Sequence, residues 1–150
     1  VCLPSVLIIR RVQPNDIFPV VALAFETLPE RYNPSIFSQF YESFPEGFLV
    51  ALNQEMIIGF LIGIKTTPNI GRILMLAVTN SYRKQGIGSS LLTDFINEMK
   101  QQNVTSVELE VRTSNKRALR FYQARGFQLQ EMLRGFYQNG ENAYSMRKEL

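Results

Sequence analysis

The sequence predicts an α+β domain in which a central mixed, mostly antiparallel β-sheet is flanked by about four helices. Short apolar, β-branched runs separated by turn residues fill most of the first half of the chain. An amphipathic helix pattern then spans residues 86–102. A strictly alternating strand pattern follows at residues 104–111. Together these three observations indicate a sheet covered by helices rather than an all-helical or all-strand fold.

The first half of the chain is expected to form four strands and two helices. Pro14-Asn15-Asp16 has residues that open a helix, and apolar residues at helical spacing follow it. Asn53-Gln54-Glu55 predicts a hairpin, and Pro68-Asn69 marks another turn. This order gives an antiparallel start to the sheet. The expected strands are residues 6–12, 47–52, 56–64 and 70–78, and the expected apolar helix faces are Ile17, Val20, Val21 and Ala24, then Ile36, Phe37, Phe40 and Tyr41.

The second half is expected to alternate between helices and strands. Ser114-Asn115 caps a helix that continues to Ala124, and Gly126 ends it. Two final strands are predicted at residues 127–137 and 143–150. No repeat, low-complexity segment or linker interrupts the pattern, so we expect one domain over residues 1–150. The apolar helix stripe at residues 86–102 is Ile87, Leu91, Leu92, Phe95, Ile96 and Met99, and the strand at residues 104–111 alternates between Val107, Leu109 and Val111 on one face and Glu108 and Glu110 on the other.

Composition excludes several kinds of chemistry. The 150 residues are 45% apolar, carry a net charge of +3 and contain no histidine. Without histidine, His-based zinc sites, Ser-His triads and Cys-His dyads are excluded, so no metal is expected. The single cysteine, Cys2, cannot form an internal disulfide, which fits a reducing compartment. No apolar run reaches the roughly 18 residues of a membrane span and no secretory leader is recognisable, so we expect a cytoplasmic protein.

The turn before the long helix has the features of a pyrophosphate site. Gly86 and Gly88 let a ligand approach the backbone closely because neither carries a side chain. The first N–H groups of the helix lack intrahelical partners, and the helix dipole adds partial positive charge. Arg83 and Lys84 add two cationic side chains. A Rossmann turn would need a third glycine where Leu91 stands, and a P-loop would need Gly-Lys-Ser/Thr, so neither pattern fits.

The stretch from Leu76-Ala77-Val78 to Gly88 resembles the coenzyme-A motif of the GNAT superfamily of N-acetyltransferases, in which Arg/Gln-x-x-Gly-x-Gly/Ala follows an apolar strand end. The resemblance continues through residues 110–115, Ala118, Phe121-Tyr122 and Gly126-Phe127, and the order of elements agrees over nearly the whole chain. It implies the GNAT fold and acetyl-CoA as co-substrate. The residues that it implies in coenzyme binding are Leu76, Ala77, Val78, Arg83, Lys84, Gln85, Gly86, Ile87, Gly88, Ser89, Asn115 and Tyr122.

Within this set, the resemblance gives each group of residues a role. Leu76 and Val78 would offer backbone groups to the pantetheine arm, residues 83–89 would hold the pyrophosphate, and Asn115 would contact the coenzyme near its thioester. Asn115 also fits a plain helix cap. Tyr122 is the candidate acid, because the family commonly places a tyrosine beside the sulfur and its reference pKa of about 10 is close to that of a leaving thiol. The alternative for Tyr122 is a packed aromatic beside Phe121.

Direct attack of an amine on the thioester requires a base but no covalent enzyme intermediate, which suits a chain without a usable histidine or cysteine. Glu110 is the candidate base, acting directly or through water, because it lies on the polar face of its strand. The alternative for Glu110 is a solvated strand carboxylate. Glu108 lies on the same face and competes for the role.

Two further segments resemble the substrate loops of protein N-terminal acetyltransferases. One is Leu28-Pro29-Glu30-Arg31-Tyr32, and the other is the ending from Phe136-Tyr137 to Tyr144. In the second, Phe136 stands where the family has a tyrosine and Asn142 where it has aspartate, so one hydroxyl that would bond substrate is missing. We expect a peptide N-terminus between Tyr32 and Tyr137. The implied substrate-binding residues are Leu28, Pro29, Glu30, Tyr32 and Tyr137.

The resemblance also narrows the acceptor. Glu110 matches the RimI-type bacterial ribosomal-protein alanine acetyltransferases, whereas the Leu28–Tyr32 loop is more similar to archaeal and eukaryotic relatives. We therefore expect an archaeal-type enzyme of broad specificity that acts on protein or peptide N-termini, including ribosomal or nascent chains, as a monomer or weak dimer without specific nucleic acid. An α-amino pKa of about 8, against about 10.4 for lysine, leaves more neutral amine at pH 7. The alternatives are a small-molecule amine or lysine acetyltransferase and a non-catalytic CoA- or nucleic-acid-binding module.

Overall fold

The structure, a computed structural model, describes residues 7–150, so the predicted strand start at Val6 and the cysteine Cys2 lie outside the described residues. Short 3-10 turns at Pro14–Asp16, Pro45–Gly47 and Asn80–Tyr82 connect some of the larger elements. In chain order these are β1 (Leu7–Arg11), α1 (Ile17–Thr27), α2 (Ser35–Ser43), β2 (Phe48–Asn53), β3 (Met56–Thr67), β4 (Ile70–Val78), α3 (Ile87–Gln101), β5 (Ser106–Arg112), α4 (Lys116–Ala124), β6 (Gln128–Leu133) and β7 (Ala143–Glu149).

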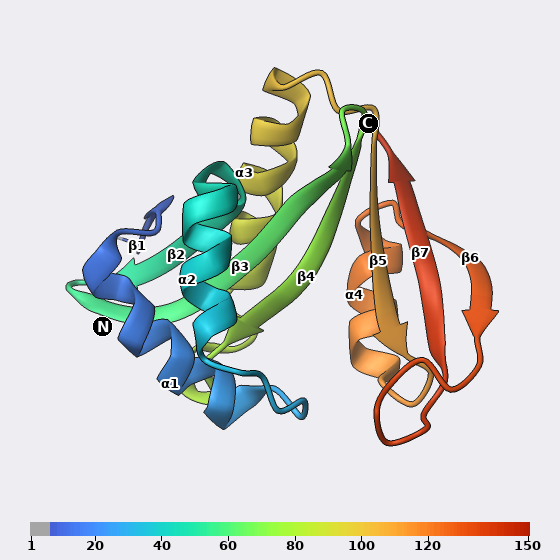
Figure 1. Cartoon of the computed structure of the whole chain (residues 1–150), viewed down its shortest axis with the longest axis horizontal. Helices are drawn as coiled ribbons and strands as arrows, with labels where there is room; N and C mark the ends of the chain where they lie inside the picture. The colour runs from blue at the N-terminus through green and yellow to red at the C-terminus, as the bar shows by residue number, and fades with distance from the viewer. Residues whose placement is uncertain (1–6) are drawn as a thin grey trace. The chain divides into compact units, whose positions relative to one another are not determined.

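The seven strands form one sheet in the order β1-β2-β3-β4-β5-β7-β6 (Figure 1). β4 and β5 run parallel, whereas β1 with β2, β2 with β3, β5 with β7 and β6 with β7 run antiparallel. In the parallel pair, Ile70 stands opposite Ser106 and Arg72 opposite Glu108. The prediction of a mixed, mostly antiparallel sheet with four helices is therefore confirmed.

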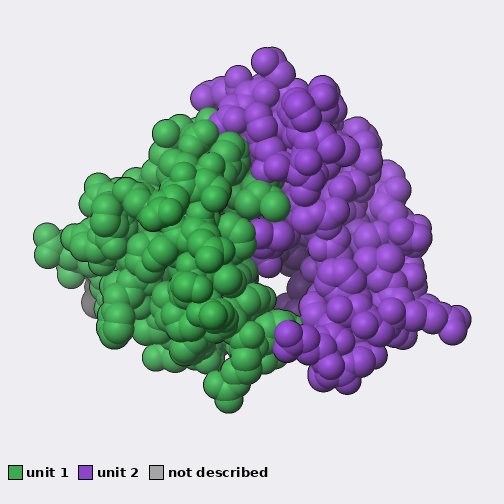
Figure 2. Space-filling model, viewed as in Figure 1, with its two compact units in different colours: residues 1–64, 75–98 green, residues 65–74, 99–150 purple. Residues whose placement is uncertain are grey.

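The chain divides into two compact units, coloured separately in Figure 2. Of the described residues, the first unit contains 7–64 and 75–98, and the second contains 65–74 and 99–150. The boundaries run through β3, β4 and α3, so each unit is built from parts of these shared elements. Among residues 7–150, no helix combines the length and the apolar character needed to cross a membrane.

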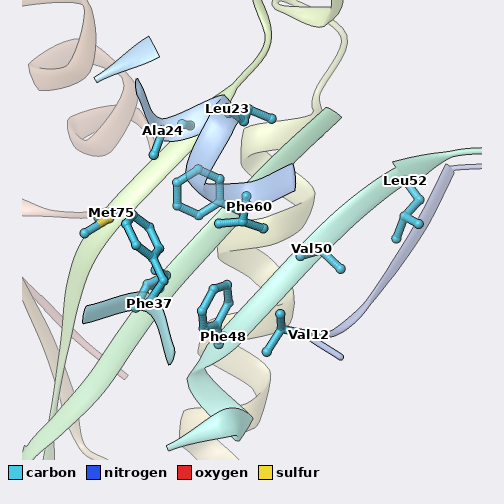
Figure 3. Close-up of a cluster of buried hydrophobic side chains, with 12 residues drawn as sticks. Val12, Leu23, Ala24, Phe37, Phe48, Val50, Leu52, Phe60 and Met75 are labelled. Carbon is cyan, nitrogen blue, oxygen red and sulfur yellow. The ribbon is translucent and has the colours of Figure 1, made fainter. Parts of the chain in front are cut away.

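The core of the first unit lies between β2, β3 and the helices α1 and α2, as Figures 1 and 3 show. Phe48, Val50 and Phe60 project from the strands, and Phe37 reaches them from α2 with its ring 6.5 Å from that of Phe60. Leu23 of α1 is also buried, although the predicted helix face did not include it. The apolar face of α1 is therefore Val20, Leu23 and Ala24, with Ile17 and Val21 only partly buried.

The helix α3 lies on the other side of β2 and β3 from α1 and α2 (Figure 1). Gly59 of β3 allows the helix to approach, since a Cβ there would lie 3.4 Å from the Leu91 side chain and 3.1 Å from the Ala77 carbonyl oxygen. Five of the six residues of the predicted apolar stripe are buried, and Ile96 is partly buried. This packing fixes the start of α3, which follows the turn with the candidate pyrophosphate site.

The second unit holds β5, β6, β7 and α4. The predicted alternation in β5 is confirmed, because Val107, Leu109 and Val111 are buried while Glu108 and Glu110 are partly exposed. The predicted cap of α4 is also confirmed, since the Asn115 side chain accepts a hydrogen bond from the Ala118 N–H at 3.1 Å.

One strand prediction is wrong at its end. We predicted a strand over residues 127–137, but β6 ends at Leu133 and residues 134–142 form a loop. The loop backbone bonds to itself, with the Tyr137 N–H donating to Glu141 O at 3.1 Å and the Gly140 N–H donating to Tyr137 O at 2.9 Å. Gly135 and Gly140 both have positive φ, which a regular strand does not tolerate.

Candidate active site

The turn between β4 and α3 has the backbone shape expected of an anion site. Lys84 has φ of 64° and Gly86 has φ of 81°, so two residues of the turn adopt the left-handed backbone region. A Cβ at Gly86 would meet no atom within 4 Å, which means that this part of the turn faces open space. A ligand can therefore reach the Gly86 backbone without displacing protein atoms.

The start of α3 presents N–H groups that no part of the described chain uses. The first helical bond is donated by the Ser90 N–H to Gly86 O at 3.0 Å. In residues 7–150, the N–H groups of Gly86, Ile87 and Gly88 donate no hydrogen bond. The helix that follows is 15 residues long, so its dipole adds partial positive charge at the same point. Among the neighbouring cations, Lys84 is exposed.

The end of β4 leads into the turn and carries the predicted coenzyme-binding residues Leu76, Ala77 and Val78. Leu76 and Val78 are partly exposed, whereas Ala77 is buried. The Val78 carbonyl oxygen, which the resemblance assigns to pantetheine, accepts a hydrogen bond from Arg83 Nε at 3.3 Å. Arg83 is therefore tied to the strand end rather than extended into solvent.

The candidate base Glu110 lies on the polar face of β5 and is mostly buried, with its side chain 15% exposed. Its Oε2 is bonded by Nη1 of Arg72, a β4 residue 38 positions earlier in the sequence. Arg72 Nη2 donates to Glu108 Oε1 at 3.1 Å, and Arg147 Nη1 of β7 donates to Glu108 Oε2 at 3.2 Å. The two carboxylates that the sequence left in competition are thus held by one ion network.

The candidate acid Tyr122 is buried in an aromatic cluster with Phe121 of α4 and Phe127, the residue that precedes β6. Its ring contacts Phe121 and Phe127 edge-on, with centroid separations of 5.1 Å and 5.4 Å. Burial raises the pKa of Tyr122 well above its ordinary value. The match between its reference pKa and that of a thiol therefore does not hold in this structure, although the hydroxyl stays protonated across the neutral range.

Asn115 precedes α4 and is exposed. Its side-chain oxygen accepts a hydrogen bond from the Ala118 N–H, so Asn115 caps the helix α4. The side-chain amide donates no hydrogen bond within the described chain and is available to a ligand. Both readings of Asn115 are thus compatible with its geometry.

The segment Leu28–Tyr32 connects α1 and α2 in the first unit. Leu28 and Tyr32 pack against the core, and the Tyr32 ring meets that of Phe37 edge-on at 6.3 Å. Burial raises the pKa of Tyr32, so its hydroxyl is also neutral at physiological pH. Pro29 is exposed and Glu30 is partly exposed.

The loop of residues 134–142 is held in the second unit by Arg112, at the end of β5. The Arg112 guanidinium stacks over the Tyr137 ring at 4.0 Å and pairs with Glu141 at 3.2 Å. Ser114 Oγ donates to Glu141 Oε2 at 2.8 Å. The Gly135 N–H donates to the Asn142 side-chain oxygen at 2.9 Å, so Asn142 braces the loop from within.

Sequence reasoning missed two residues that organise these groups. Arg112 belonged to the quoted motif without a role of its own, and Arg72 was not singled out at all. A signal existed for Arg72, since it is the only charged residue in the apolar run of β4. The structure describes no cluster of three or more Cys, Asp or Glu residues in the 7–150 range that could hold a metal ion.

A mixed sheet with a positively polarised turn at the start of its long helix is the arrangement expected of the GNAT acetyltransferases. The acetyltransferase (GNAT) family model matches residues 17–127, and the chain belongs to that family. It is an N-acetyltransferase, as its relatives are.

Similar proteins come from archaea, bacteria and eukaryotes. The chain is 30% identical to an N-alpha-acetyltransferase of Saccharolobus solfataricus, over 95% of this chain and 92% of that protein. The crystal structure of Ard1 from Thermoplasma volcanium has a TM-score of 0.93 and 36% identity, covering 96% of this chain and 97% of that one. The ribosomal-protein-S18-alanine N-acetyltransferase of Escherichia coli shares the fold, with a TM-score of 0.84 and 22% identity, over 96% and 94% of the two chains.

Proposed function

We propose that this protein transfers an acetyl group from acetyl-CoA to the α-amino group of protein N-termini. The observation that carries the proposal is the turn at the start of α3, where three consecutive residues, Gly86, Ile87 and Gly88, donate no backbone hydrogen bond within the described chain. In a member of the GNAT family, a diphosphate is the anion that such a turn fits best.

The coenzyme would be held mainly by backbone and by cations of the turn. Its pyrophosphate would accept hydrogen bonds from the start of α3, and the exposed Lys84 would neutralise part of its charge. Residues 76–78, Arg83, Gln85, Ser89, Asn115 and Tyr122 complete the proposed coenzyme-binding set. The thioester supplies the activated acetyl group, so the protein's own residues have only to bind, orient and move protons.

In the proposed reaction the amine nitrogen attacks the thioester carbonyl carbon directly. The new C–N bond forms, the C–S bond breaks, and the sulfur leaves as the thiol of CoA. Glu110 takes the proton that the amine loses, directly or through water, and Tyr122 supplies a proton to the leaving sulfur. Burial raises the pKa of Tyr122 and keeps its hydroxyl protonated, so the hydroxyl can donate a hydrogen bond to the sulfur as negative charge develops there.

Support for an N-terminal acceptor comes from relatives and from the loops. An archaeal relative that is 30% identical is called an N-alpha-acetyltransferase, and a fission-yeast relative that is 31% identical is called N-alpha-acetyltransferase 30. Tyr32 and Tyr137 present aromatic rings braced by Phe37 and by Arg112, respectively. We propose that Leu28, Pro29, Glu30, Tyr32 and Tyr137 bind the first residues of ribosomal or nascent chains; a monomeric or weakly dimeric state stays a prediction.

The proposal is tested by following release of the CoA thiol from acetyl-CoA with peptides that begin with Ser, Ala or Met. A small polyamine and an N-terminally blocked copy of each peptide serve as the alternative acceptors. We expect thiol release with the free peptides and background rates with the others. Faster release with the polyamine would establish a small-molecule acetyltransferase instead, and no release with any amine would favour a non-catalytic module.

A further inference from the structure

An arginine outside the family motif is bonded to the candidate base. Arg72 stands opposite Glu108 in the β4–β5 register and one strand repeat away from Glu110. Its guanidinium donates two hydrogen bonds, one from Nη2 to Glu108 Oε1 at 3.1 Å and one from Nη1 to Glu110 Oε2. The rigid fork of the guanidinium therefore spans both carboxylates on this face of β5.

The two carboxylates are engaged differently. Both oxygens of Glu108 accept hydrogen bonds, one from Arg72 and one from Arg147. Only Oε2 of Glu110 is bonded, and no residue in the described part of the chain donates to its Oε1. The β7 residue that pairs with Glu110 is Ser145, which carries no charge. Oε1 of Glu110 is thus the one carboxylate oxygen of the pair that accepts no hydrogen bond within the described chain.

Arg72 also limits how Glu110 can move. A glutamate carboxylate rotates freely about its last side-chain bond, so its oxygens exchange unless a donor holds one of them. Arg72 holds Oε2, and its other end is anchored by Glu108. The Arg72 and Glu110 side chains are 27% and 15% exposed, so water competes less for this bond than at a fully exposed pair.

We propose that Arg72 is a positioning residue, which holds Glu110 by Oε2 so that Oε1 receives the proton of the acceptor amine. This inference rests on the proposed function, because it needs Glu110 to act as the base. Arg72 does not take part in the proton transfer. Its contribution is orientation, and a base that is misplaced by about 1 Å can lose about 100-fold in rate.

The test is a double-mutant cycle of three variants, Arg72→Met, Glu110→Gln and the two combined. For each, kcat is measured together with the KM for acetyl-CoA and the KM for the peptide acceptor. We expect R72M to lower kcat by about 10- to 100-fold while the KM for acetyl-CoA changes by less than about 3-fold. In the E110Q background, R72M should lower kcat by no more than about 2-fold further, because the group it positions is already gone.

Two additional variants keep the test decisive. Arg147→Met removes the other arginine that binds Glu108 but has no bond to Glu110, so we expect kcat within about 3-fold of the wild type. Arg72→Lys keeps the charge without the fork, and we expect a kcat between those of R72M and the wild type. Should R72M fail to fold by circular dichroism, R72K takes its place in the cycle with E110Q.

The outcomes separate this inference from the function on which it rests. If E110Q loses activity but R72M and R72K keep wild-type kcat, Arg72 does not position the base, and the proposed function stands. Equal losses from R72M with and without E110Q would also overturn the inference, because Arg72 would then act elsewhere. A wild-type enzyme that acetylates no N-terminus, or an E110Q variant at full rate, would overturn the assignment of Glu110 and this inference together.

Discussion

The guanidinium of Arg112 lies 4.0 Å from the centre of the Tyr137 ring and pairs with Glu141 at 3.2 Å. Arg112 is the last residue of β5, the strand that carries Glu110 two positions earlier. The proposed substrate loop is therefore braced from the same strand face as the candidate base. A change in this brace should disturb acceptor binding more than chemistry.

Replacing Arg112 with lysine tests the brace, because lysine keeps the charge but loses the planar stacking and the fork. We expect the KM for a peptide acceptor to rise by about 3- to 10-fold and the KM for acetyl-CoA to stay within about 2-fold. Arg125→Lys is the matched control, since Arg125 stacks on Phe121 at 3.8 Å and donates a hydrogen bond through Nη1 to the Phe121 carbonyl oxygen at 2.9 Å. Equal effects from the two variants would refute a specific role for Arg112.

Tyr122→Phe removes one hydroxyl while leaving the ring contacts with Phe121 and Phe127 in place. We expect kcat to fall by about 10- to 1,000-fold, because proton donation to the sulfur is lost. The dissociation constant for acetyl-CoA, measured by calorimetry, should change by less than about 3-fold. An unchanged kcat would leave Tyr122 with a packing role only.

The same variant makes a prediction about stability at alkaline pH. The folded-state pKa of Tyr122 is raised by burial, so the unfolded chain ionises this tyrosine first as the pH rises. The stability that depends on the neutral hydroxyl is present below about pH 10 and is lost above it. Between pH 10 and 11, the wild type should lose about 1 kcal/mol more unfolding free energy than Y122F in urea denaturation. Parallel losses in both proteins would contradict the burial of this hydroxyl.

Gly86→Ala tests the phosphate turn. Gly86 has φ of 81°, where alanine costs about 1 kcal/mol, and its Cβ would project into the open space that the coenzyme is proposed to use. We expect the KM for acetyl-CoA to rise by about 10-fold or more. Gly140→Ala is a matched control, because Gly140 has φ of 86° and equally open surroundings. Both variants should lose similar unfolding free energy, but only G86A should raise the KM for acetyl-CoA. A similar rise in that KM for G140A would refute the assignment of the coenzyme site to the turn at Gly86.

Local patterns were sufficient for most of the fold. The strand Ile70–Val78 was predicted with both its ends, because Pro68-Asn69 marks its start and an apolar run defines its length. The end of β6 was not, because apolar residues continue past Leu133 and resemble a longer strand. What stops the strand is the hydrogen bonding of residues 134–142 and their contact with Arg112, which no local pattern contains.

The candidate site divides in the same way. The N–H groups at the start of α3 follow from helix geometry and two glycines, so the sequence alone could identify them. The choice between Glu108 and Glu110 could not be made from alternation, since both lie on one face. The difference comes from Arg72 and Arg147, which the sheet brings to β5 from 36 and 39 residues away.

The most direct test of the account uses one peptide that has a free N-terminal serine and an internal lysine. The peptide is incubated with the protein and isotopically labelled acetyl-CoA, and the position of the label is read by tandem mass spectrometry. We predict one labelled acetyl group, on the N-terminal nitrogen, and none when that nitrogen is blocked beforehand. A label on the lysine side chain, or its persistence after blocking, would contradict N-terminal acetyl transfer.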